Sequence, residues 1–200
     1  MKTPTFHHER ELLAQGYRVI VGVDEAGCAA LAGPVVAAAV VLPLNSRLKL
    51  IRDSKQLNVQ QRERLYDLID ECAYDWAIGT ASHREIGAWG LRQANYIAME
   101  RAVKQIHDAD FVLVDAWTLQ NLKLPQRGII RGDCTVKSIA AASIMAKVWR
   151  DRLMINYART YPQYGFDQHK GYPTRHHKAT IKKNGPCAIH RTSWQIFQTF

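Results

Sequence analysis

Acidic residues directly follow three short apolar runs in this 200-residue chain. In open α/β sheets, ligand sites gather outside the carboxyl ends of parallel strands, so these side chains converge if their strands are neighbours. Successive residues on a strand point to opposite faces, so an adjacent pair of carboxylates shares a site only where the strand bends away, which Gly27 would permit. The four acidic positions are Asp24, Glu25, Asp115 and Asp133.

Converging carboxylates repel one another and raise one another's pKa values unless a cation compensates. Hard oxygen ligands without a nearby thiolate or paired histidine favour Mg²⁺ or Mn²⁺ over Zn²⁺. Two such ions about 3.5–4 Å apart can hydrolyse a phosphodiester, one activating water and the other stabilising the leaving oxygen. A phosphatase or a nucleotidyl transferase uses the same parts, and a turn or helix cap is the structural alternative for any single aspartate.

The elements that would position these carboxylates can be predicted from hydrophobic periodicity. Three strands followed by alternating helix and strand indicate an α/β fold with a mixed central sheet flanked by helices. Small residues link the first two strands, which predicts an antiparallel hairpin. The predicted strands are 19–23, 35–42, 74–81, 111–114 and 129–130, and the predicted helices are 58–72, with Asn58 as N-cap, 91–106 and 136–157.

Composition limits the class of protein. The formal net charge of +9 favours a polyanionic partner. The four scattered cysteines predict reduced thiols, because they form neither a zinc pattern nor a disulfide framework. No apolar run approaches the roughly 18 residues of a membrane helix, and no signal peptide is apparent, which predicts a cytoplasmic protein without membrane contact.

We expect one domain over residues 1–200, with a catalytic core at about 18–160. The segment at about 161–200 is rich in Tyr, His, Lys and Arg, and it predicts a basic loop and helix outside the core. His176 and His177 on that helix are expected to face solvent or phosphate rather than a metal.

Seven motifs between residues 18 and 194 together resemble the ribonuclease HII family, the prokaryotic type 2 ribonucleases H. They are VGVDEAG, LAGPVVAAAVVL, DSKQL, VLVDA, RGDCTVKSIAAASIMAKVWRD, YPQYGFDQHKGYPT and HRTSW. The resemblance implies a ribonuclease H-like fold and an endonuclease holding two divalent cations, Mg²⁺ or Mn²⁺, and we expect the enzyme to be a monomer. Such an enzyme cuts the RNA strand of RNA–DNA hybrids, and ribonucleotides embedded in duplex DNA, leaving 5′-phosphate and 3′-hydroxyl ends. The family's four acidic active-site positions match the four carboxylates above.

The resemblance also implies substrate contacts. Tyr172 matches the tyrosine that stacks on the deoxyribose next to the ribonucleotide, and aromatic stacking is a physical means expected for such reading. The family's tripeptide that reads the 2′-hydroxyl matches three residues here. These substrate-binding candidates are Gly27, Cys28 and Ala29, and the positions that resemble phosphate contacts, with solvated surface charge as the alternative, are Ser54, Lys55, Lys170 and Arg191.

Several residues depart from the family pattern. The family usually has Gly-Arg-Gly-Pro where this chain has Gly27 to Ala30, and the methyl group of Ala29 obstructs both positive φ and close backbone approach. Ala116 replaces a usual Gly, and Trp194 replaces a frequent Phe. We predict an active hydrolase that discriminates single embedded ribonucleotides less well. Cys28 as a nucleophile or redox switch is disfavoured, because the sequence places no histidine partner beside it.

Two other functions remain open to the sequence. One is a non-catalytic module that binds RNA–DNA hybrids, and retention of all four carboxylates argues against it. The other is a related-fold nuclease acting on damaged DNA, which Tyr172 within HKGYPT disfavours. The final SWQIFQTF resembles tails that bind sliding clamps, but it lacks their full spacing, so we expect it to pack onto the domain.

Overall fold

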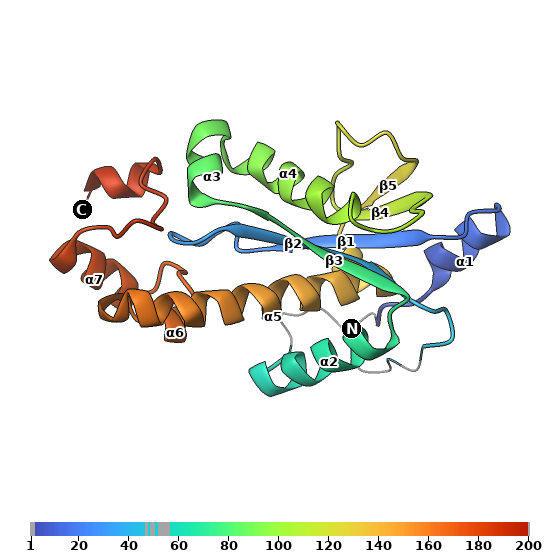
Figure 1. Ribbon diagram of the computed structural model, residues 1–200, viewed down its shortest axis with the longest axis horizontal. Coiled ribbons are helices and arrows are strands. Elements are labelled where there is room, and N and C mark those ends of the chain that lie inside the picture. The colour runs from blue at the N-terminus through green and yellow to red at the C-terminus, as the bar shows by residue number, and fades with distance from the viewer. Residues whose placement is uncertain (1–2, 47, 49–50, 52–56, 200) are drawn as a thin grey trace.

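A mixed β-sheet occupies the centre of the computed structural model, which describes residues 3–46, 48, 51 and 57–199 (Figure 1). The strand order is β3-β2-β1-β4-β5. β1 pairs antiparallel with β2, and β2 with β3, whereas β1 pairs parallel with β4, and β4 with β5. This confirms the predicted hairpin and the mixed sheet. The strands are β1 (Ile20–Ala26), β2 (Val35–Val41), β3 (Asp75–Ala81), β4 (Phe111–Asp115) and β5 (Gln126–Ile129).

Helices cover both faces of the sheet (Figure 1). α3 (His83–Trp89) and α4 (Leu91–Val103) lie on one face, and α2 (Val59–Cys72) and α5 (Lys137–Thr160) on the other. The three predicted helices are confirmed, whereas α1 and α3 were not anticipated. The remaining elements are α1 (His7–Ala14), α6 (Phe166–His169), α7 (Arg175–Asn184) and the short 3-10 turns η2 (Gly132–Cys134), η3 (Pro162–Tyr164) and η4 (Gln195–Thr199).

Two local features explain why the site-bearing elements sit where they do. Asn58 caps α2 through a capping box with Gln61, because each side chain accepts a hydrogen bond from the other residue's backbone N–H. On the same face of the sheet, α5 approaches β1 so closely that a Cβ at Gly22 would lie 2.2 Å from the carbonyl carbon of Ser138. The Ala-rich first half of α5 permits this contact and fixes β1 against it.

The C-terminal segment contributes to the core, so the expectation that it lies outside the core is wrong. Its aromatic residues fold back onto the C-terminal half of α5 and the loop after β1, and they bury an apolar cluster there. Phe197 packs against this cluster, and its ring centroid lies 5.7 Å from that of His190, which confirms that the tail packs onto the domain. The buried members are Leu31, Ala32, Met154, Tyr164, Phe166, Ile181 and Ile189.

Two expectations from composition can be compared with the structure. All four cysteines are free thiols, as predicted. Among the described residues, no helix combines the length and the apolar character needed to cross a membrane.

Candidate active site

The register of the parallel strands brings two of the acidic residues together. Val23 on β1 lies opposite Val114 on β4, so the next residues in this register are Asp24 and Asp115. Asp115 in turn lies opposite Ile129, the last residue of β5. The chain leaves β5 there and turns through η2, which carries Asp133 beside Asp115.

Asp24 and Glu25 lie within β1 rather than after it, which corrects the expectation that the strand ends before them. Both remain paired with β2, so the strand does not bend between them and their side chains point to opposite faces. They nevertheless line one cavity of about 320 Å³, together with Asp115. We attribute this to the end of β4 at Asp115, which leaves the edge of β1 uncovered beyond Asp24.

Hydrogen bonds fix the orientation of two of these carboxylates. Asp24 Oδ1 accepts from the backbone N–H of Glu25 at 2.7 Å, and the Ser143 hydroxyl on α5 donates to the same side chain. Asp115 Oδ1 accepts from the backbone N–H of Gly132 at 2.7 Å, and the backbone N–H of Asp133 also donates to it. Donors from the backbone and from α5 therefore hold both carboxylates at the cavity.

The carboxylates are electrostatically strained without a cation. Burial, followed by the negative charges of Glu25 and Asp115, raises the pKa of Asp24 well above its usual value. Burial and the charge of Asp133 raise the pKa of Asp115. Bound cations would compensate this repulsion.

The donor set fits Mg²⁺ or Mn²⁺, because the ligands offered are carboxylate oxygens and, of the described residues that line the cavity, Cys28 alone carries a thiol. Among the described residues, no group of three or more His, Cys, Asp or Glu side chains is arranged so that it could hold one metal ion by itself. Mg²⁺ usually takes one or two carboxylates and completes its shell with water and substrate phosphates, so an open arrangement agrees with this chemistry.

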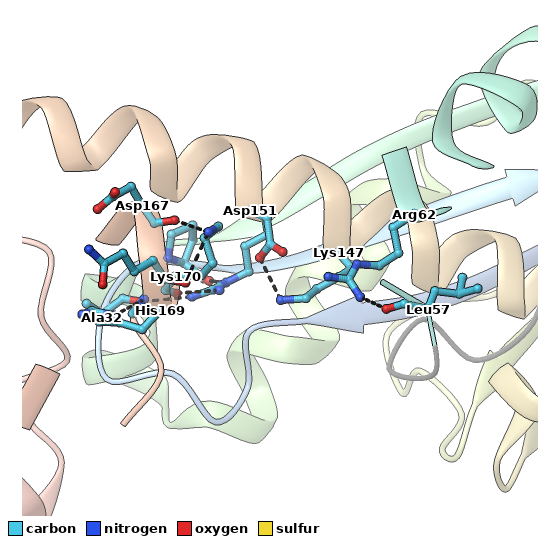
Figure 2. A network of polar contacts seen from close by, with 12 residues as sticks. Ala32, Leu57, Arg62, Lys147, Asp151, Asp167, His169 and Lys170 are labelled. Carbon is cyan, nitrogen blue, oxygen red and sulfur yellow. Dashed lines mark hydrogen bonds and ion pairs between the residues drawn. The ribbon is translucent and has the colours of Figure 1, made fainter. Parts of the chain in front are cut away.

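Cationic and aromatic side chains line the same cavity. Tyr172, Lys147 and Arg62 are among its lining residues. Lys147 Nζ lies 4.9 Å from the centroid of the Tyr172 ring and forms an ion pair of 2.8 Å with Asp151. Figure 2 shows Lys147 between Asp151 and Arg62, and Arg62 donates to the carbonyl of Leu57. An anionic strand would meet positive charge and one aromatic face here.

The residues expected to read the 2′-hydroxyl also line the cavity. Gly27 has φ +96°, so the chain turns sharply directly after β1. Cys28 Sγ donates to Glu25 Oε1 at 3.4 Å, and burial raises the pKa of this thiol above its usual value, which agrees with the rejection of Cys28 as a nucleophile. Ala29 is exposed and does not have positive φ, so the expected conflict of its methyl group with the backbone conformation is wrong, whereas obstruction of a closely approaching substrate stays a prediction.

The four expected phosphate contacts have different outcomes. Ser54 and Lys55 lie outside the described residues. Lys170 is half-buried, and its ammonium group donates to the carbonyls of Asp167 and Gln168 within its own turn. The expectation that Arg191 lies on the surface is wrong, because its side chain is 1% exposed and donates to backbone carbonyls of the loop after β1.

Some residues at the site were missed by sequence reasoning. Ser143 and Lys147 lie one helical turn apart on α5 and both line the cavity. Their signal was present in the sequence as polar residues at i and i+4 within an otherwise Ala-rich helix. Arg62 gave no comparable signal, because it is one of two arginines on a helix rich in charged residues and looks like solvated surface.

Ala116, which stands where the family usually has Gly, has a strained backbone conformation. Its φ is +62°, a left-handed conformation that costs a non-glycine residue roughly 1 kcal/mol or more. We expect Ala116→Gly to raise the free energy of unfolding by about 0.5–1 kcal/mol, measured by thermal denaturation. Ala29→Gly is the matched control and should lower it, since Ala29 has no such strain to relieve. The same sign for both variants would contradict this reading.

Three histidines form a buried network behind Tyr172, so the expectation of a solvent-facing His177 is wrong, whereas His176 is exposed. His177 Nδ1 donates to the Tyr172 carbonyl at 2.9 Å. His190 Nδ1 accepts from the backbone N–H of Cys187 at 2.8 Å, so its other nitrogen carries the proton and donates to His177 Nε2 at 3.0 Å. The ring of His169 stacks on that of His177, with centroids 4.2 Å apart. All three must be neutral to satisfy this network.

The buried histidines should make the fold sensitive to acid. Burial lowers the pKa of His177 and of His190 to about 4, below the unfolded value near 6.5. The unfolded chain therefore binds protons first, so the stabilisation is complete above pH 6.5 and is lost as pH falls toward 4, by roughly 2–3 kcal/mol for each imidazole. Melting temperatures at pH 7.5 and 5.0 measure this loss.

The buried carboxyl groups have raised pKa values and oppose this trend, so variants must be compared. His190→Gln should flatten the dependence of melting temperature on pH, while replacement of the exposed His107 by Gln should leave it unchanged. Equal slopes for His190→Gln and the unaltered protein would rule out the buried histidines as the cause.

Comparisons with known proteins agree with this geometry. A sequence model of the family described as Ribonuclease HII matches residues 21–197. Ribonuclease HII of Syntrophotalea carbinolica is 47% identical over 190 residues, which make up 94% of this chain and 91% of that protein. Sequence similarity of this extent covers the sheet, the cavity and most of the C-terminal segment.

Solved structures show the same fold. The ribonuclease H2 from Pyrococcus horikoshii superposes with a TM-score of 0.77 at 23% identity, covering 91% of this chain and 96% of that one. RNase HII in a complex with PCNA from Archaeoglobus fulgidus gives a TM-score of 0.72 at 22% identity, covering 88% and 94%. This likeness confirms the predicted ribonuclease H-like sheet flanked by helices.

Proposed function

This chain belongs to the ribonuclease HII family, and we propose that Asp24, Glu25, Asp115 and Asp133 are the residues with which it holds its divalent cations. It is a metal-dependent endoribonuclease of type 2 that hydrolyses the RNA strand of RNA–DNA hybrids. The observation that carries the site assignment is the register of β1 with β4, which brings Asp24 next to Asp115, and both residues line the cavity.

We propose two cations, Mg²⁺ or Mn²⁺. When bound, such ions act as Lewis acids on the phosphodiester and generate the attacking hydroxide from water. Asp24 and Asp115 are held in place by backbone N–H groups and the Ser143 hydroxyl, so the ligands need no reorganisation on binding. Lys147 lines the same cavity, where its ammonium group can pair with a phosphate of the bound strand.

The substrate proposal includes single ribonucleotides embedded in duplex DNA. Tyr172 supports it, because its half-buried ring lines the same cavity as the carboxylates and can stack on a sugar at the cleavage site. Gly27, Cys28 and Ala29 line the cavity near Glu25 and are proposed to contact the ribose. We expect 5′-phosphate and 3′-hydroxyl ends.

We further propose that the enzyme is a monomer with one domain. The archaeal neighbour described above was solved with PCNA, and a sliding-clamp contact through the C-terminal tail is a separate proposal for this chain. Against that contact, Trp194, Ile196 and Phe197 pack toward the domain. Gel filtration with and without a bacterial sliding clamp tests both points, since a monomer elutes at about 22.7 kDa.

Cleavage of two labelled duplexes tests the proposed function. One carries a single ribonucleotide and the other a longer RNA run, and both are incubated with Mg²⁺ and with Mn²⁺. We expect cleavage of both that disappears in Asp115→Asn, which controls for contaminating nuclease. Binding of the duplexes without cleavage in either metal would instead identify a hybrid-binding protein.

A further inference from the structure

Two arginines are buried beneath the cavity, and neither has an acidic partner among the residues that the structure describes. Arg150 on α5 is 0% exposed and Arg191 is 1% exposed. In the part of the chain that the structure describes, neither guanidinium forms an ion pair, and all their hydrogen bonds go to backbone carbonyls. A buried charge is costly unless its donors are fully satisfied, so such an arrangement calls for a reason.

Five of the six accepting carbonyls belong to one segment, residues 27–34, here called the cavity loop. Arg191 donates to Gly27, Cys28 and Gly33 at 2.7–3.0 Å. Arg150 donates to two other carbonyls of the same loop, so the two guanidinium groups bind different parts of it. The acceptors of Arg150 within the loop are Ala32 and Pro34, each at 3.0 Å.

The sixth carbonyl connects this loop to the segment that carries Tyr172. Arg150 Nη1 donates to the carbonyl of Lys170 at 3.0 Å, and its Cζ lies 5.2 Å from the centroid of the Tyr172 ring. The backbone N–H of Leu31 also donates to Gly171 at 2.8 Å. Figure 2 shows Ala32, His169 and Lys170 gathered at this junction.

A short antiparallel backbone contact joins the cavity loop to residues 190–191. The backbone N–H of Arg191 donates to the Leu31 carbonyl at 2.9 Å, and Ala32 forms an isolated antiparallel bridge with His190. Segments that are far apart in the sequence, 27–34, 170–172 and 189–191, are thus joined by two side chains and a few backbone bonds. Movement of one segment should be transmitted to the others.

The positive charge of Arg150 and Arg191 can also act on the cavity above them. Burial lowers the pKa of Arg191 to about 9, so the group is still protonated at neutral pH. Among the described residues, the hydrogen-bond partners of both guanidinium groups are carbonyl oxygens, and each group also lies near an aromatic ring, Tyr172 or Trp194. No carboxylate neutralises them there, so two positive charges remain beneath a cavity that both carboxylates and Lys147 line. A phosphodiester strand is the anion that enters this cavity.

We propose that Arg150 and Arg191 are positioning residues for substrate selection, which hold the cavity loop and the Tyr172 segment as one unit and thereby set how well a single ribonucleotide is distinguished from an RNA run. This inference rests on the proposed function for its substrates. Neither arginine touches the reacting atoms in this role. A purely structural role would instead lower stability and reduce cleavage of all substrates equally.

Hydrogen exchange tests the coupling without any substrate. Arg191→Lys keeps the charge but loses the planar fork that reaches three carbonyls. We expect it to speed amide exchange at least about tenfold in residues 27–34 and also in 170–174, which Arg191 does not contact. Arg150→Lys should do the same, whereas the exposed Arg152→Lys on the same helix should not. Because Arg150 contacts both segments, Arg191→Lys is the decisive variant, and faster exchange confined to 27–34 in that variant would overturn the proposal.

The unaltered protein provides the same test if a lysine variant does not fold. Native-state exchange at increasing denaturant should give one shared opening free energy for 27–34 and 170–174. Two clearly different opening free energies would refute the single unit.

Cleavage kinetics then test selection. For each lysine variant, we expect kcat/KM to fall about 10- to 100-fold on the duplex with one ribonucleotide and less than about threefold on the RNA run. An equal fall on both substrates would identify a structural role and contradict the proposal. If the unaltered protein cleaves neither duplex, the proposed function fails, whereas the exchange experiment still decides whether the two segments are coupled.

Discussion

Asp24→Asn should abolish cleavage and, in the absence of divalent cations, make the protein more stable. Asn keeps the oxygen that accepts from the backbone of Glu25, so the local geometry survives. It removes a carboxylate that burial and the charges of Glu25 and Asp115 disfavour. We expect kcat/KM to fall by roughly 10³-fold or more, because one cation loses an anionic ligand. We expect the melting temperature to rise by about 3–6 °C, equivalent to about 1–2 kcal/mol.

The opposite signs of these two effects distinguish a ligand from a structural aspartate. Added Mg²⁺ or Mn²⁺ should raise the melting temperature of the unaltered protein, because the ion binds only the folded state, and should do so less in the variant. Replacement of the exposed Asp67 by Asn is the control and should change neither quantity. A loss of stability in metal-free Asp24→Asn would mean that the cavity does not strain this carboxylate.

The meeting of Asp24 with Asp115 could be predicted, because parallel neighbouring strands present their carboxyl ends at the same edge of a sheet. Asp115 stands at the end of β4, and the parallel register with β1 then brings Asp24 to it. The exact strand boundary was not predictable, since Asp24 and Glu25 interrupt the apolar pattern while the backbone pairing with β2 continues to Ala26. Backbone pairing, rather than side-chain polarity, decides where this strand ends.

The arginines and histidines of the C-terminal half could not be placed from the sequence. A basic residue is usually exposed, yet Arg191 is buried because carbonyls from residues 27–33, more than 150 positions earlier, accept its donors. His177 is buried in the same way by His190 and the Tyr172 carbonyl. These partners are brought together by tertiary contacts, which leave no periodic pattern in the sequence.

Gly27→Ala should be the most damaging single substitution in the cavity loop. Its Cβ would lie 2.1 Å from Nε of Arg150, and the residue has φ +96°. The positive φ alone costs about 1–2 kcal/mol. Displacement of Arg150 would also break its bonds to three carbonyls and leave its charge buried without partners, which typically costs 3–5 kcal/mol. We expect the free energy of unfolding to fall by more than about 3 kcal/mol, measured by denaturant unfolding.

Gly16→Ala separates the two causes, because Gly16 has φ +103° with nothing within 4 Å of the added Cβ. It should cost only the conformational part, and the difference between the variants then measures the displacement of Arg150. Equal costs would mean that the guanidinium moves aside freely. The contrast between an occupied and an open space beside the Cβ also explains why Ala29 can carry a methyl group two positions away from Gly27. Ala29 is exposed and free of positive φ, so its methyl group meets neither obstacle, whereas the space beside Gly27 is already filled by the buried side chain that supports the loop.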